Sequence, residues 1–589
     1  MKRRQLLGAG LAMTGAAALG LPPQRAAAEA AAARVRPGQP GWPADADWAV
    51  LNQATNGHLS PVTTPPKLDA YDAVKLLSNP FYIADQPALT ESSGWLDAWR
   101  SSPSAYVVTA ENAQDVAAAV GFARAHNLRL VIKGRGHSYL GTSNAPDSLL
   151  IWTRRMDTVT IHDAFTPAGS SAAPVSAVSV GAGCMWLHAY QAVTVGAGRY
   201  VQGGGCTTVG VAGLVQGGGF GSFSKGFGTG AASLLEAEIV TADGKIRVVN
   251  QAREPDLFWA LKGGGGGAFG VVTRLTLATH ELPETFGTVN LTLHARSDAA
   301  YRLLLARFVD FYATSLFNPH WGEQVRAEPD NVLDVSMVFQ GLTQDQARAA
   351  WKPLIDFANA NSTDYIGQNS LSVAAVPAKL IWNADLMRLV PGVIVSDSRP
   401  GAAPTDFWWA GATEEVGAFW HAYTSAWMPA SLLDAQNQSR LVDAWFAASR
   451  HWPVSFHFNK GLAGAPAAAI DATRDTATNP DVLSAFALAI IAANGPSLYF
   501  GGSPELVAAH AQAARVQAAM TALRVAAPNT GAYVNECDYF QEGWQTAFWG
   551  PHYPRLARIK RRYDPDGLFT VHHGVGSEAW SADGFTRVA

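Results

Sequence analysis

The turn formed by residues 134–139 combines residue types that can bind an anion. It reads Gly-Arg-Gly-His-Ser-Tyr and follows a short apolar segment, 128–133, that we expect to be a strand. Backbone N–H groups, a guanidinium and hydroxyl groups can surround a phosphate-like anion, so the turn is suited to a pyrophosphate. His137 in isolation would be an ordinary turn residue. The neighbouring glycines, and a second glycine-rich stretch later in the chain, favour a functional site instead.

That second stretch, residues 203–221, contains nine glycines, one cysteine (Cys206) and no charged residue. Glycine at this density is costly in a strand or helix, because it loses the most backbone entropy on folding. It is useful where backbone must lie flush against a flat ligand. A flexible linker is the alternative, but linkers are usually polar. We therefore expect a cofactor-lining wall, since the stretch also contains the apolar residues Val209, Val211, Leu214, Val215 and Phe220.

The chain contains three cysteines: Cys184, Cys206 and Cys537. An odd, small number does not supply a disulfide framework. One bridge between Cys184 and Cys206 stays open as a structural role for Cys206. No CxxC motif or cysteine–histidine cluster indicates a metal, so no metal site is predicted.

The segments around the turn and the glycine-rich stretch alternate between strand and helix patterns. Residues 265–270, GGGAFG, match the dinucleotide-binding pattern GxGxxG. That pattern requires a strand before it and a helix after it, and here the order is reversed, so we exclude a Rossmann unit. Strands are expected at 106–108, 128–133, 149–152, 159–162, 175–180, 231–241 and 271–278, and helices at 112–125, 186–195 and 256–262.

Composition indicates a compact protein of more than one domain. The chain has 589 residues, which is too many for one core. Charged residues make up 15% of it, against a usual share of about 25%. No extended basic stripe indicates nucleic acid as a partner. Residues 553–563 form a basic helical segment, but a solvated face is favoured over nucleic-acid binding because the net charge is -4.

The N-terminus has the pattern of an export signal. Lys2, Arg3 and Arg4 precede a short apolar run at 6–21, and three alanines at 26–28 offer a cleavage site. The run is too short for a comfortable membrane span, so we expect no stable membrane anchor. The arginine pair resembles a twin-arginine signal, with an ordinary secretory signal as the alternative. Residues 1–28 therefore predict export through the twin-arginine translocase, to the periplasm or outside the cell.

The middle of the chain, from about 284 to 529, differs in character. Expected strands at 290–293 and 333–340 alternate with expected helices at 301–314 and 343–360, which suggests an antiparallel sheet with helices on one face. Residues 29–100 are expected to be a leader and an N-terminal cap. Tryptophans recur in the middle segment and either line a substrate cleft or pack in the core: Trp321, Trp382, Trp408, Trp409, Trp420, Trp427, Trp445 and Trp452.

Four stretches together resemble the berberine bridge enzyme-like flavoproteins of the vanillyl-alcohol oxidase superfamily, which have a PCMH-type FAD-binding domain. They are residues 134–139, 206–221, 263–270 and 533–538, in the order expected of that family. The resemblance extends from Ser104 to Trp580. It is specific for family and cofactor, and weak for substrate. The tail phrase VHHGVGSE at 571–578 is similar to fungal isoamyl alcohol oxidase-like proteins.

The resemblance implies an α+β fold in two discontinuous units. Residues 100–283 and a returning C-terminal segment, 530–589, would form the FAD-binding domain. Residues 284–529 would form an inserted substrate-binding domain, whose antiparallel sheet is covered by helices. Residues 29–99 would be an N-terminal extension.

The same resemblance implies an extended FAD with its pyrophosphate at 134–139. His137 occupies the position of a histidine bonded to the flavin 8α-methyl, and Cys206 that of a cysteine bonded to flavin C6. Thr207 stands where proline is common. Val209, three residues after the cysteine, favours access of dioxygen and therefore an oxidase. The FAD-binding residues implied are Gly134, Arg135, Gly136, His137, Ser138, Tyr139, Gly141, Cys206, Val209, Gly210, Gly213, Gln216, Gly217, Gly218, Gly221, Gly270, Val271 and Val272.

Two positions depart from the family pattern. Leu214 stands where the family often has a histidine near flavin N1, so Gln216 or backbone must stabilise the reduced flavin there. Glu536 stands where sugar- and phenol-oxidising relatives place a tyrosine base, which argues against glucooligosaccharide or phenolic substrates. We expect Glu536 to be the general base, Tyr533 to orient the substrate hydroxyl and Asn535 to support both.

The resemblance therefore implies an exported FAD-dependent oxidase that takes hydride from the carbon of an alcohol or sugar hydroxyl and reduces dioxygen to hydrogen peroxide. For Glu536 the alternative is a structural carboxylate paired with the basic segment 553–563. Alternatives for the function are a flavin dehydrogenase and an oxidative ring-forming enzyme of secondary metabolism. A carbohydrate-binding or scaffold protein without flavin chemistry is the non-enzyme alternative.

Overall fold

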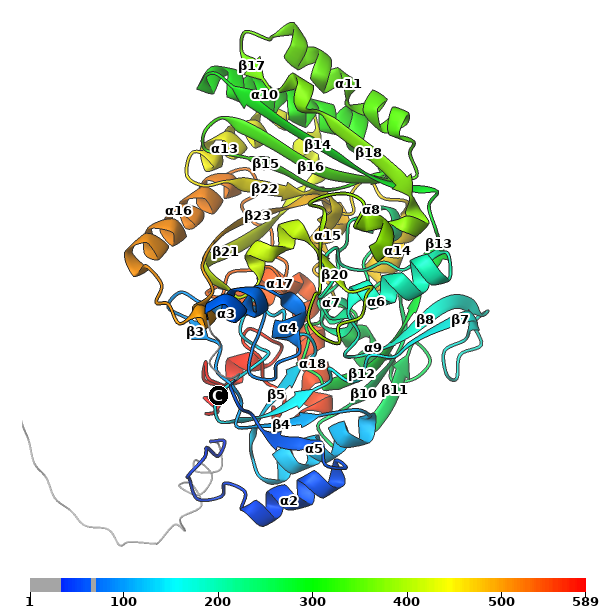
Figure 1. Cartoon of the computed structure of the whole chain (residues 1–589), viewed down its shortest axis with the longest axis vertical. Helices are drawn as coiled ribbons and strands as arrows, with labels where there is room; N and C mark the ends of the chain where they lie inside the picture. The colour runs from blue at the N-terminus through cyan, green and yellow to red at the C-terminus, as the bar shows by residue number, and fades with distance from the viewer. Residues whose placement is uncertain (1–32, 65–69, 589) are drawn as a thin grey trace, which may run out of the picture.

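The computed structural model describes residues 33–64 and 70–588. The export signal predicted at 1–28 lies outside the described residues. The described chain forms two lobes (Figure 1). The lower lobe contains a four-stranded and a five-stranded sheet, and the upper lobe contains a ten-stranded sheet. No helix in this described part is long and apolar enough to cross a bilayer.

The four-stranded sheet of the lower lobe carries the turn at 134–139. Its order is β1 (Leu59–Pro61), β4 (Tyr106–Thr109), β6 (Ser148–Trp152) and β5 (Arg129–Lys133). β4, β6 and β5 run parallel. The carboxyl ends of parallel strands meet at one edge, so the turn after β5 and Thr153 after β6 lie together there.

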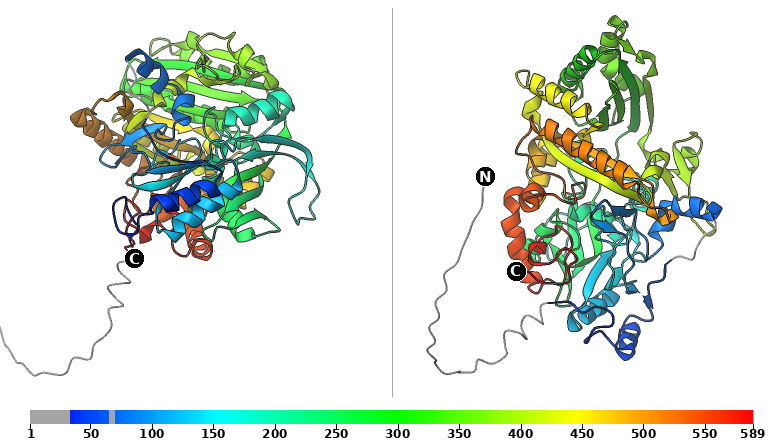
Figure 2. Two further views of the ribbon diagram at one scale, coloured as in Figure 1. Left: turned by 60° about the horizontal axis from the view of Figure 1, so that its bottom comes forward. Right: turned by 90° about the vertical axis from the view of Figure 1, so that its left-hand side faces the viewer.

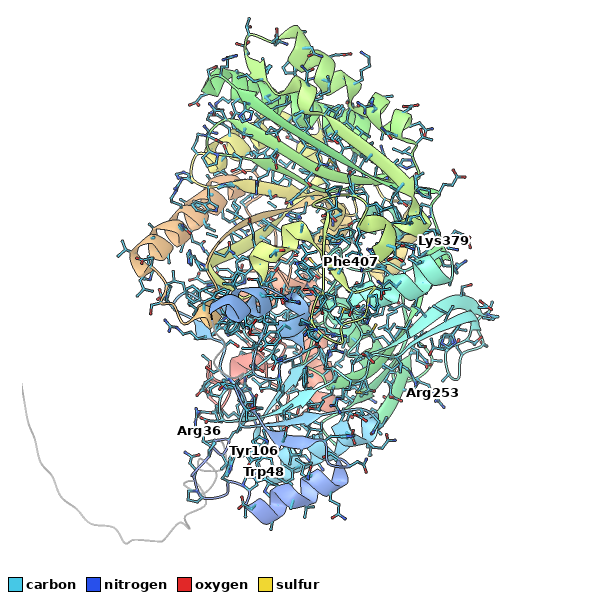
Figure 3. The ribbon with its side chains drawn as sticks, in the orientation of Figure 1. Arg36, Trp48, Tyr106, Arg253, Lys379 and Phe407 are labelled. Carbon is cyan, nitrogen blue, oxygen red and sulfur yellow. The ribbon has the colours of Figure 1, made fainter. Side chains whose placement is uncertain are left out.

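Helices cover the outer face of this sheet. The first is α5 (Ala113–Ala125), where Asn112 caps the start by accepting a hydrogen bond from the N–H of Asp115. The second is α2 (Asp45–Ala54), whose Trp48 stacks on Tyr106 of β4 with ring centroids 4.0 Å apart (Figure 3). These contacts close the bottom of the lower lobe.

The five-stranded sheet is antiparallel throughout. Its order is β11 (Ile246–Asn250), β10 (Leu234–Val240), β12 (Val271–Ala278), β8 (Val175–Gly181) and β7 (Val159–Phe165). The predicted strand at 271–278 is β12 without a change of bounds. The predicted helix at 186–195 is α6 (Trp186–Tyr190) continued by a π-helical turn.

The ten-stranded sheet forms the upper lobe, and its neighbouring strands are antiparallel except at β2. Along β14 the alternate residues Val289, Leu291 and Leu293 are buried in one core with the covering helices. This confirms the predicted antiparallel sheet with helices on one face. Its strands are β17 (Tyr365–Ile366), β14 (Thr285–Ala295), β18 (Ser372–Pro377), β16 (Val332–Gln340), β15 (Trp321–Ala327), β22 (Val454–His457), β23 (Ala485–Gly495), β21 (Ala418–Pro429), β2 (Ser92–Trp95) and β3 (Trp99–Arg100). Its covering helices are α10 (Asp298–Phe311), α11 (Gln344–Ala360), α13 (Gln438–Ser449) and α16 (Leu506–Arg524).

The opposite face of this sheet points to the lower lobe. Tyr423 and Trp427 of β21 and Leu488 of β23 are buried there in one cluster with Phe220 and Tyr533. Figure 2 shows the sheet lying directly above the lower lobe. The upper lobe therefore forms the roof of the space between the two lobes.

Residues 33–100 are more than the expected leader and cap. β2 pairs in parallel with β21 and so belongs to the sheet of the upper lobe. Within the described residues this segment also contains α2, α3 (Ala70–Leu77) and α4 (Pro80–Ala84). The short β2 has little periodicity of its own, and its partner strand lies more than 300 residues later, so sequence patterns did not indicate this pairing.

The C-terminal segment returns to the lower lobe, as the resemblance implies. α17 (Trp544–Trp549) and α18 (Tyr553–Tyr563) lie there, and α18 contacts α9 (Pro255–Leu261) (Figures 1 and 2). Lys560 of α18 is buried, and its Nζ donates to the carbonyls of Ala268 and Phe569, both at 2.6 Å. The basic segment 553–563 is therefore a helix with one side packed on the lower lobe, and its exposed Arg558, Arg561 and Arg562 form the solvated face that the sequence predicts.

The remaining elements are short. They are α7 (Val211–Gln216), α8 (Ser224–Phe227), α12 (Ala384–Met387), α14 (Ala467–Arg474) and α15 (Asp481–Ser484), and the strand pairs β9 (Arg199–Tyr200) with β13 (His280–Glu281) and β19 (Ile394–Ser396) with β20 (Phe407–Trp409).

Candidate active site

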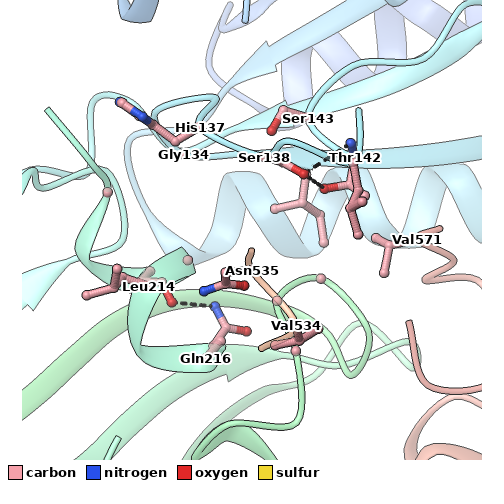
Figure 4. Close-up of a pocket in the computed structure, with 18 of the residues that line it drawn as sticks. Gly134, His137, Ser138, Thr142, Ser143, Leu214, Gln216, Val534, Asn535 and Val571 are labelled. Carbon is pink, nitrogen blue, oxygen red and sulfur yellow. Dashed lines mark hydrogen bonds between the residues drawn. The ribbon is translucent and has the colours of Figure 1, made fainter. Parts of the chain in front are cut away.

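A cavity of about 270 Å³ lies between the two lobes. It is lined by residues from segments far apart in sequence, within 132–143, 209–216, 265–272, 533–536 and 571–574, and by Lys460. Figure 4 shows the turn at 134–143 facing Gln216 and Asn535. The cavity brings together most of the predicted site residues: Gly134, Arg135, Gly136, His137, Ser138, Tyr139, Val209, Gly210, Gly213, Gln216, Gly270, Val272, Tyr533, Asn535 and Glu536.

Six predicted cofactor-binding residues do not line this cavity. Cys206 is exposed, and Val271 is buried in the core between α5 and β12. The other four are glycines that pack against protein: an added Cβ would lie 2.5 Å from Trp99 at Gly141, 2.2 Å from Asn535 at Gly217, 3.2 Å from Thr478 at Gly218 and 1.6 Å from the Gly203 carbonyl at Gly221. Part of the glycine density at 203–221 therefore serves close packing between protein segments.

Two glycines in the cavity wall face open space. An added Cβ at Gly213 or at Gly266 would meet no protein atom within 4 Å. The first lies in α7 and the second in the run that precedes β12. A flat ligand can approach the backbone closely at both positions. This arrangement fits the expected FAD.

The turn at 134–139 supplies polar groups that have no protein partner. Arg135 is 2% exposed, and its Nε donates to the carbonyl of Gly183 at 2.7 Å. Its Nη1 and Nη2 have no hydrogen-bond partner. Burial and the neighbouring Arg154 lower the pKa of Arg135 to about 9. A buried guanidinium with two unused nitrogens fits the expected pyrophosphate.

His137 lies in the middle of this turn. Its Nε2 has no hydrogen-bond partner. Burial, followed by the charge of Arg135, lowers the pKa of His137 to about 4. The imidazole is therefore neutral near pH 7 and retains a lone pair, which a nucleophile requires.

Short helix α7 carries two residues opposite the turn. Nε2 of Gln216 donates to the carbonyl of Ala212 at 3.0 Å, as Figure 4 shows. One amide proton of Gln216 is thus already used within the helix. Leu214 lines the cavity and offers no polar atom. Gly213 and Gly210 expose backbone beside it.

The segment 533–536 forms a tight turn that the upper lobe holds in place. The N–H of Glu536 donates to the carbonyl of Tyr533 at 2.9 Å. Ser425 of β21 bonds both ends: its Oγ donates to the carbonyl of Glu536 at 2.5 Å and accepts from the N–H of Tyr533 at 3.2 Å. Nδ2 of Asn535 donates to the phenol oxygen of Tyr533 at 3.0 Å. Three polar side chains therefore project from one anchored turn.

Glu536 is paired with Lys460. Nζ of Lys460 lies 2.6 Å from Oε1 of Glu536 and also bonds Oε2. Sequence patterns did not indicate this partner, because Lys460 lies 76 residues away and in no motif. The alternative that Glu536 pairs with α18 is wrong: Arg555 pairs with Asp256 at 2.9 Å.

Three further carboxylates, Glu91, Glu323 and Glu415, lie outside the cavity lining but near residues of its wall. Burial raises the pKa of Glu91 and of Glu323, and the charge of Glu415 raises it further for Glu91. Tyr139 donates to Oε2 of Glu415 at 3.4 Å. Ser222 donates to Glu323. No motif indicated these residues, because they come from separate loops and strands.

The other end of the cavity is lined by His572 and His573. His572 stacks on Tyr539 with ring centroids 3.8 Å apart, and His573 stacks on His572 at 3.9 Å. Burial lowers the pKa of His573 to about 3, and its Nδ1 has no partner. Both histidines belong to the C-terminal segment 571–578, whose sequence resembles the family. The sequence did not show that they line the cavity, and the tertiary structure does.

The tryptophans of the middle segment serve packing. Trp321, Trp445 and Trp427 are each at most 2% exposed in the core clusters. Among the described residues, the one tryptophan that lines the cavity is Trp549 of α17. Of the two roles that the sequence left open, core packing is therefore correct.

The cysteines are not bridged. Cys184 and Cys537 are buried, Cys206 is exposed, and all three are free. The bridge between Cys184 and Cys206 does not form. Within the described residues, no group of three or more histidines, cysteines or carboxylates is arranged to hold a metal ion.

Comparison with known proteins gives consistent matches. The chain matches the FAD binding domain family over residues 103–250 and the berberine and berberine like family over residues 532–576. The FAD-linked oxidoreductase easE of Arthroderma otae is 31% identical, over 94% of this chain and 91% of the relative. The VAO-type flavoprotein oxidase VAO615 of Thermothelomyces thermophilus is 29% identical, over 94% of this chain and 95% of the relative.

Solved structures agree with these matches. The VAO-type flavoprotein MtVAO615 from Myceliophthora thermophila C1 superposes with a TM-score of 0.75 and 26% identity, over 94% of this chain and all of that one. Glucooligosaccharide oxidase from Acremonium strictum shares the fold, with a TM-score of 0.63 and 19% identity over 80% and 92% of the two chains. Since similarity to these relatives spans almost the full length, the chain belongs to the berberine bridge enzyme-like FAD-linked oxidoreductases of the vanillyl-alcohol oxidase superfamily.

Proposed function

We propose that this protein is an FAD-dependent oxidase that oxidises the carbon of an alcohol or sugar hydroxyl and passes the electrons to dioxygen, forming hydrogen peroxide. The observation that carries the proposal is the position of the turn at 533–536. Its carboxylate, phenol and amide line the same cavity as the turn that contains His137. A proton acceptor and a redox cofactor would thus share one enclosed space.

When bound, FAD supplies the hydride acceptor. Glu536 accepts the hydroxyl proton of the substrate while hydride leaves the adjacent carbon. Lys460 holds the carboxylate of Glu536 in one orientation, through bonds to both oxygens. The phenol oxygen of Tyr533 accepts from Asn535, so its own proton is free to bond the substrate oxygen.

The proposal includes covalent attachment of FAD through His137 and Cys206. The neutral imidazole of His137 supports the first link. Exposure of the Cys206 thiol, which is not in a disulfide, supports the second. Glucooligosaccharide oxidase, which has the same fold, carries a 6-S-cysteinyl, 8α-N1-histidyl FAD, so this fold can accommodate both links.

Dioxygen is proposed as the electron acceptor. Val209 lines the cavity next to Gly210, at the position that the family resemblance associates with access of dioxygen. A relative of similar length is named a flavoprotein oxidase. Mixing reduced enzyme with dissolved oxygen in a stopped-flow instrument tests this step. Reoxidation on the timescale of turnover supports an oxidase, and slow reoxidation identifies a dehydrogenase.

Substitution Glu536→Gln tests the role of the proposed base. It should give a yellow, flavin-loaded protein in which substrate reduces the flavin about 10²–10⁴-fold more slowly, as loss of a general base predicts. Glu542→Gln, in the same tail, is the matched control and should leave reduction unchanged. Reduction at the rate of the unchanged protein in Glu536→Gln would exclude Glu536 as the base. A panel of alcohols and sugars with peroxide detection identifies the substrate for this test.

We also propose export through the twin-arginine translocase, which is known for carrying proteins that fold and load their cofactor before transport. The Arg3-Arg4 pair supports this route. Replacing both arginines by lysine should retain the flavin-loaded protein inside the cell while leaving its fold unchanged. Normal export of that double variant would indicate an ordinary secretory signal.

A further inference from the structure

Glu91, which is buried, and His137, which is partly buried, face each other through two buried atoms that have no hydrogen-bond partner. Oε2 of Glu91 lies 3.9 Å from Nε2 of His137. Neither atom has a hydrogen-bond partner. Glu91 is 5% exposed. Buried carboxylates without a bonded partner are costly, and such groups cluster at functional sites.

The backbone fixes Glu91 beside the turn. The N–H of Glu91 donates to the carbonyl of Gly136 at 3.0 Å. On its other side, the carbonyl of Glu91 accepts from the N–H of Gly417 at 2.6 Å. Gly417 directly precedes β21, and Glu91 directly precedes β2. Glu91 is thus held between the turn of the lower lobe and the sheet of the upper lobe.

We propose that Glu91 is a positioning residue for the covalent attachment of FAD: it takes up the proton that the imidazole of His137 must lose when that ring bonds to the flavin. The inference rests on the attachment at His137 that the proposed function includes. Glu91 lies outside the matched family regions, 103–250 and 532–576.

The chemistry of the attachment explains the need for a proton acceptor. A ring nitrogen of His137 forms a bond to the 8α-carbon, a C–H bond of that carbon breaks, and the N–H proton of the ring leaves to the carboxylate of Glu91, which faces the ring at Nε2. The electron pair of the broken C–H bond enters the flavin and passes to dioxygen, the acceptor of the proposed function. Dioxygen, two electrons and the two protons released give hydrogen peroxide, so the step balances.

The surroundings of the pair favour this direction of proton transfer. Burial keeps the ring of His137 neutral before reaction, because it lowers the pKa of the imidazole to about 4. Burial, and then the charge of Glu415, raises the pKa of Glu91, which makes its carboxylate a stronger proton acceptor. A positive ring left in this buried place would be costly without Glu91.

The test follows attachment rather than activity. Protein produced under flavin limitation is incubated with FAD and oxygen, and the flavin on the His137 peptide and on the Cys206 peptide is measured separately by mass spectrometry over time. Glu91→Gln keeps the size of the side chain but cannot take up a proton. It should slow attachment at His137 by at least about 100-fold, the low end for loss of a proton acceptor, while Cys206 is still modified.

Two further variants separate proton transfer from packing. Glu414→Gln removes an exposed carboxyl of the segment before β21, and it should attach flavin at the normal rate. Glu91→Asp retains a carboxylate in a shorter side chain, and it should attach flavin faster than Glu91→Gln. A packing role predicts the reverse order, because Gln resembles Glu more closely in size, and that order would overturn the proposal.

The outcomes also distinguish this proposal from the proposed function. Normal attachment at His137 in Glu91→Gln overturns the role of Glu91 alone. Absence of flavin from the His137 peptide of the unchanged protein overturns the attachment itself. Should Glu91→Gln fail to fold, Glu91→Asp carries the test: modification at Cys206 without any at His137 would then contradict the proposal.

Discussion

Lys460 and Glu536 form an ion pair inside the cavity, with Nζ of Lys460 2.6 Å from Oε1 of Glu536. The lysine directly follows the core residues Phe458 and Asn459 of the upper lobe, and the glutamate belongs to the tail that returns to the lower lobe. Their side chains are 11% and 20% exposed. The pair therefore joins the two lobes at the point where we place the reacting hydroxyl group.

Removing the positive charge of Lys460 should slow the reduction of the flavin by substrate. In Lys460→Met the carboxylate of Glu536 loses charge-assisted bonds to both oxygens, each of a kind worth about 1.5–3 kcal/mol. We expect a folded, flavin-loaded protein whose flavin is reduced roughly 10–100-fold more slowly, measured by anaerobic stopped-flow absorbance. Lys379→Met, at an exposed position labelled in Figure 3, is the control. Equal reduction rates in both variants would contradict a role for the pair.

The hydroxyl of Ser425 should matter more to the site than to the fold. Ser425→Ala removes two hydrogen bonds from the turn at 533–536, which we expect to cost about 1–3 kcal/mol of unfolding free energy and to slow flavin reduction. Ser455→Ala is matched to it, because Ser455 is also buried in this sheet and donates to Gln324 at 2.7 Å. The control should lose stability without a change in reduction rate. If the two variants reduce flavin equally well, Ser425 does not position the turn.

Gly213 offers a probe of cofactor approach. An added Cβ meets no protein atom within 4 Å at Gly213 or at Gly121, and both glycines lie in helices. Gly121→Ala, in α5, should be neutral or stabilising by about 0.5–1 kcal/mol. Gly213→Ala should fold equally well but bind less FAD, because its methyl group enters the cavity. Flavin absorbance per protein and thermal unfolding measure the two effects, and an unchanged flavin content in Gly213→Ala would place the flavin elsewhere.

His280 should make stability depend on pH. Burial, followed by the charge of Arg199, lowers the pKa of His280 to about 4, so the folded protein keeps this ring neutral. The unfolded chain takes up a proton near pH 6.5. The contribution of neutral His280 to the free energy of unfolding is therefore complete above about pH 6.5, and it is lost as the pH falls toward 4.

Substitution His280→Gln removes that dependence. The unchanged protein loses stability as the pH falls from 6.5 to 4.5, and the variant lacks this loss. The free energy of unfolding of the variant minus that of the unchanged protein should therefore increase over this range. Urea unfolding at several pH values measures the difference. A difference that stays constant over this range would show that His280 does not contribute in this way. His280 does not line the cavity, so flavin content should not change.

Local sequence patterns specified the separate parts of the site. The turn at 134–139, the strand β12 and the helix α5 are encoded by neighbouring residues, because turn chemistry, capping and alternation depend on short-range contacts. The glycine-rich stretch at 203–221 indicated a wall that lines a cofactor site, and Gly213 of this stretch lies where a ligand can approach the backbone. The order of the motifs also indicated the family, and that prediction is confirmed.

The tertiary structure decided how those parts meet. Ser425, Lys460 and Glu91 lie in no motif. Ser425 anchors the turn at 533–536, Lys460 pairs with Glu536, and Glu91 faces His137. Their partners are 46 to 111 residues away in the chain. The same holds for Gly217 and Gly221, whose lack of a side chain makes room for Asn535 and the Gly203 carbonyl. Such contacts depend on the packing of the two lobes against each other. Local sequence patterns reflect short-range contacts, so they do not predict which distant surfaces pack together.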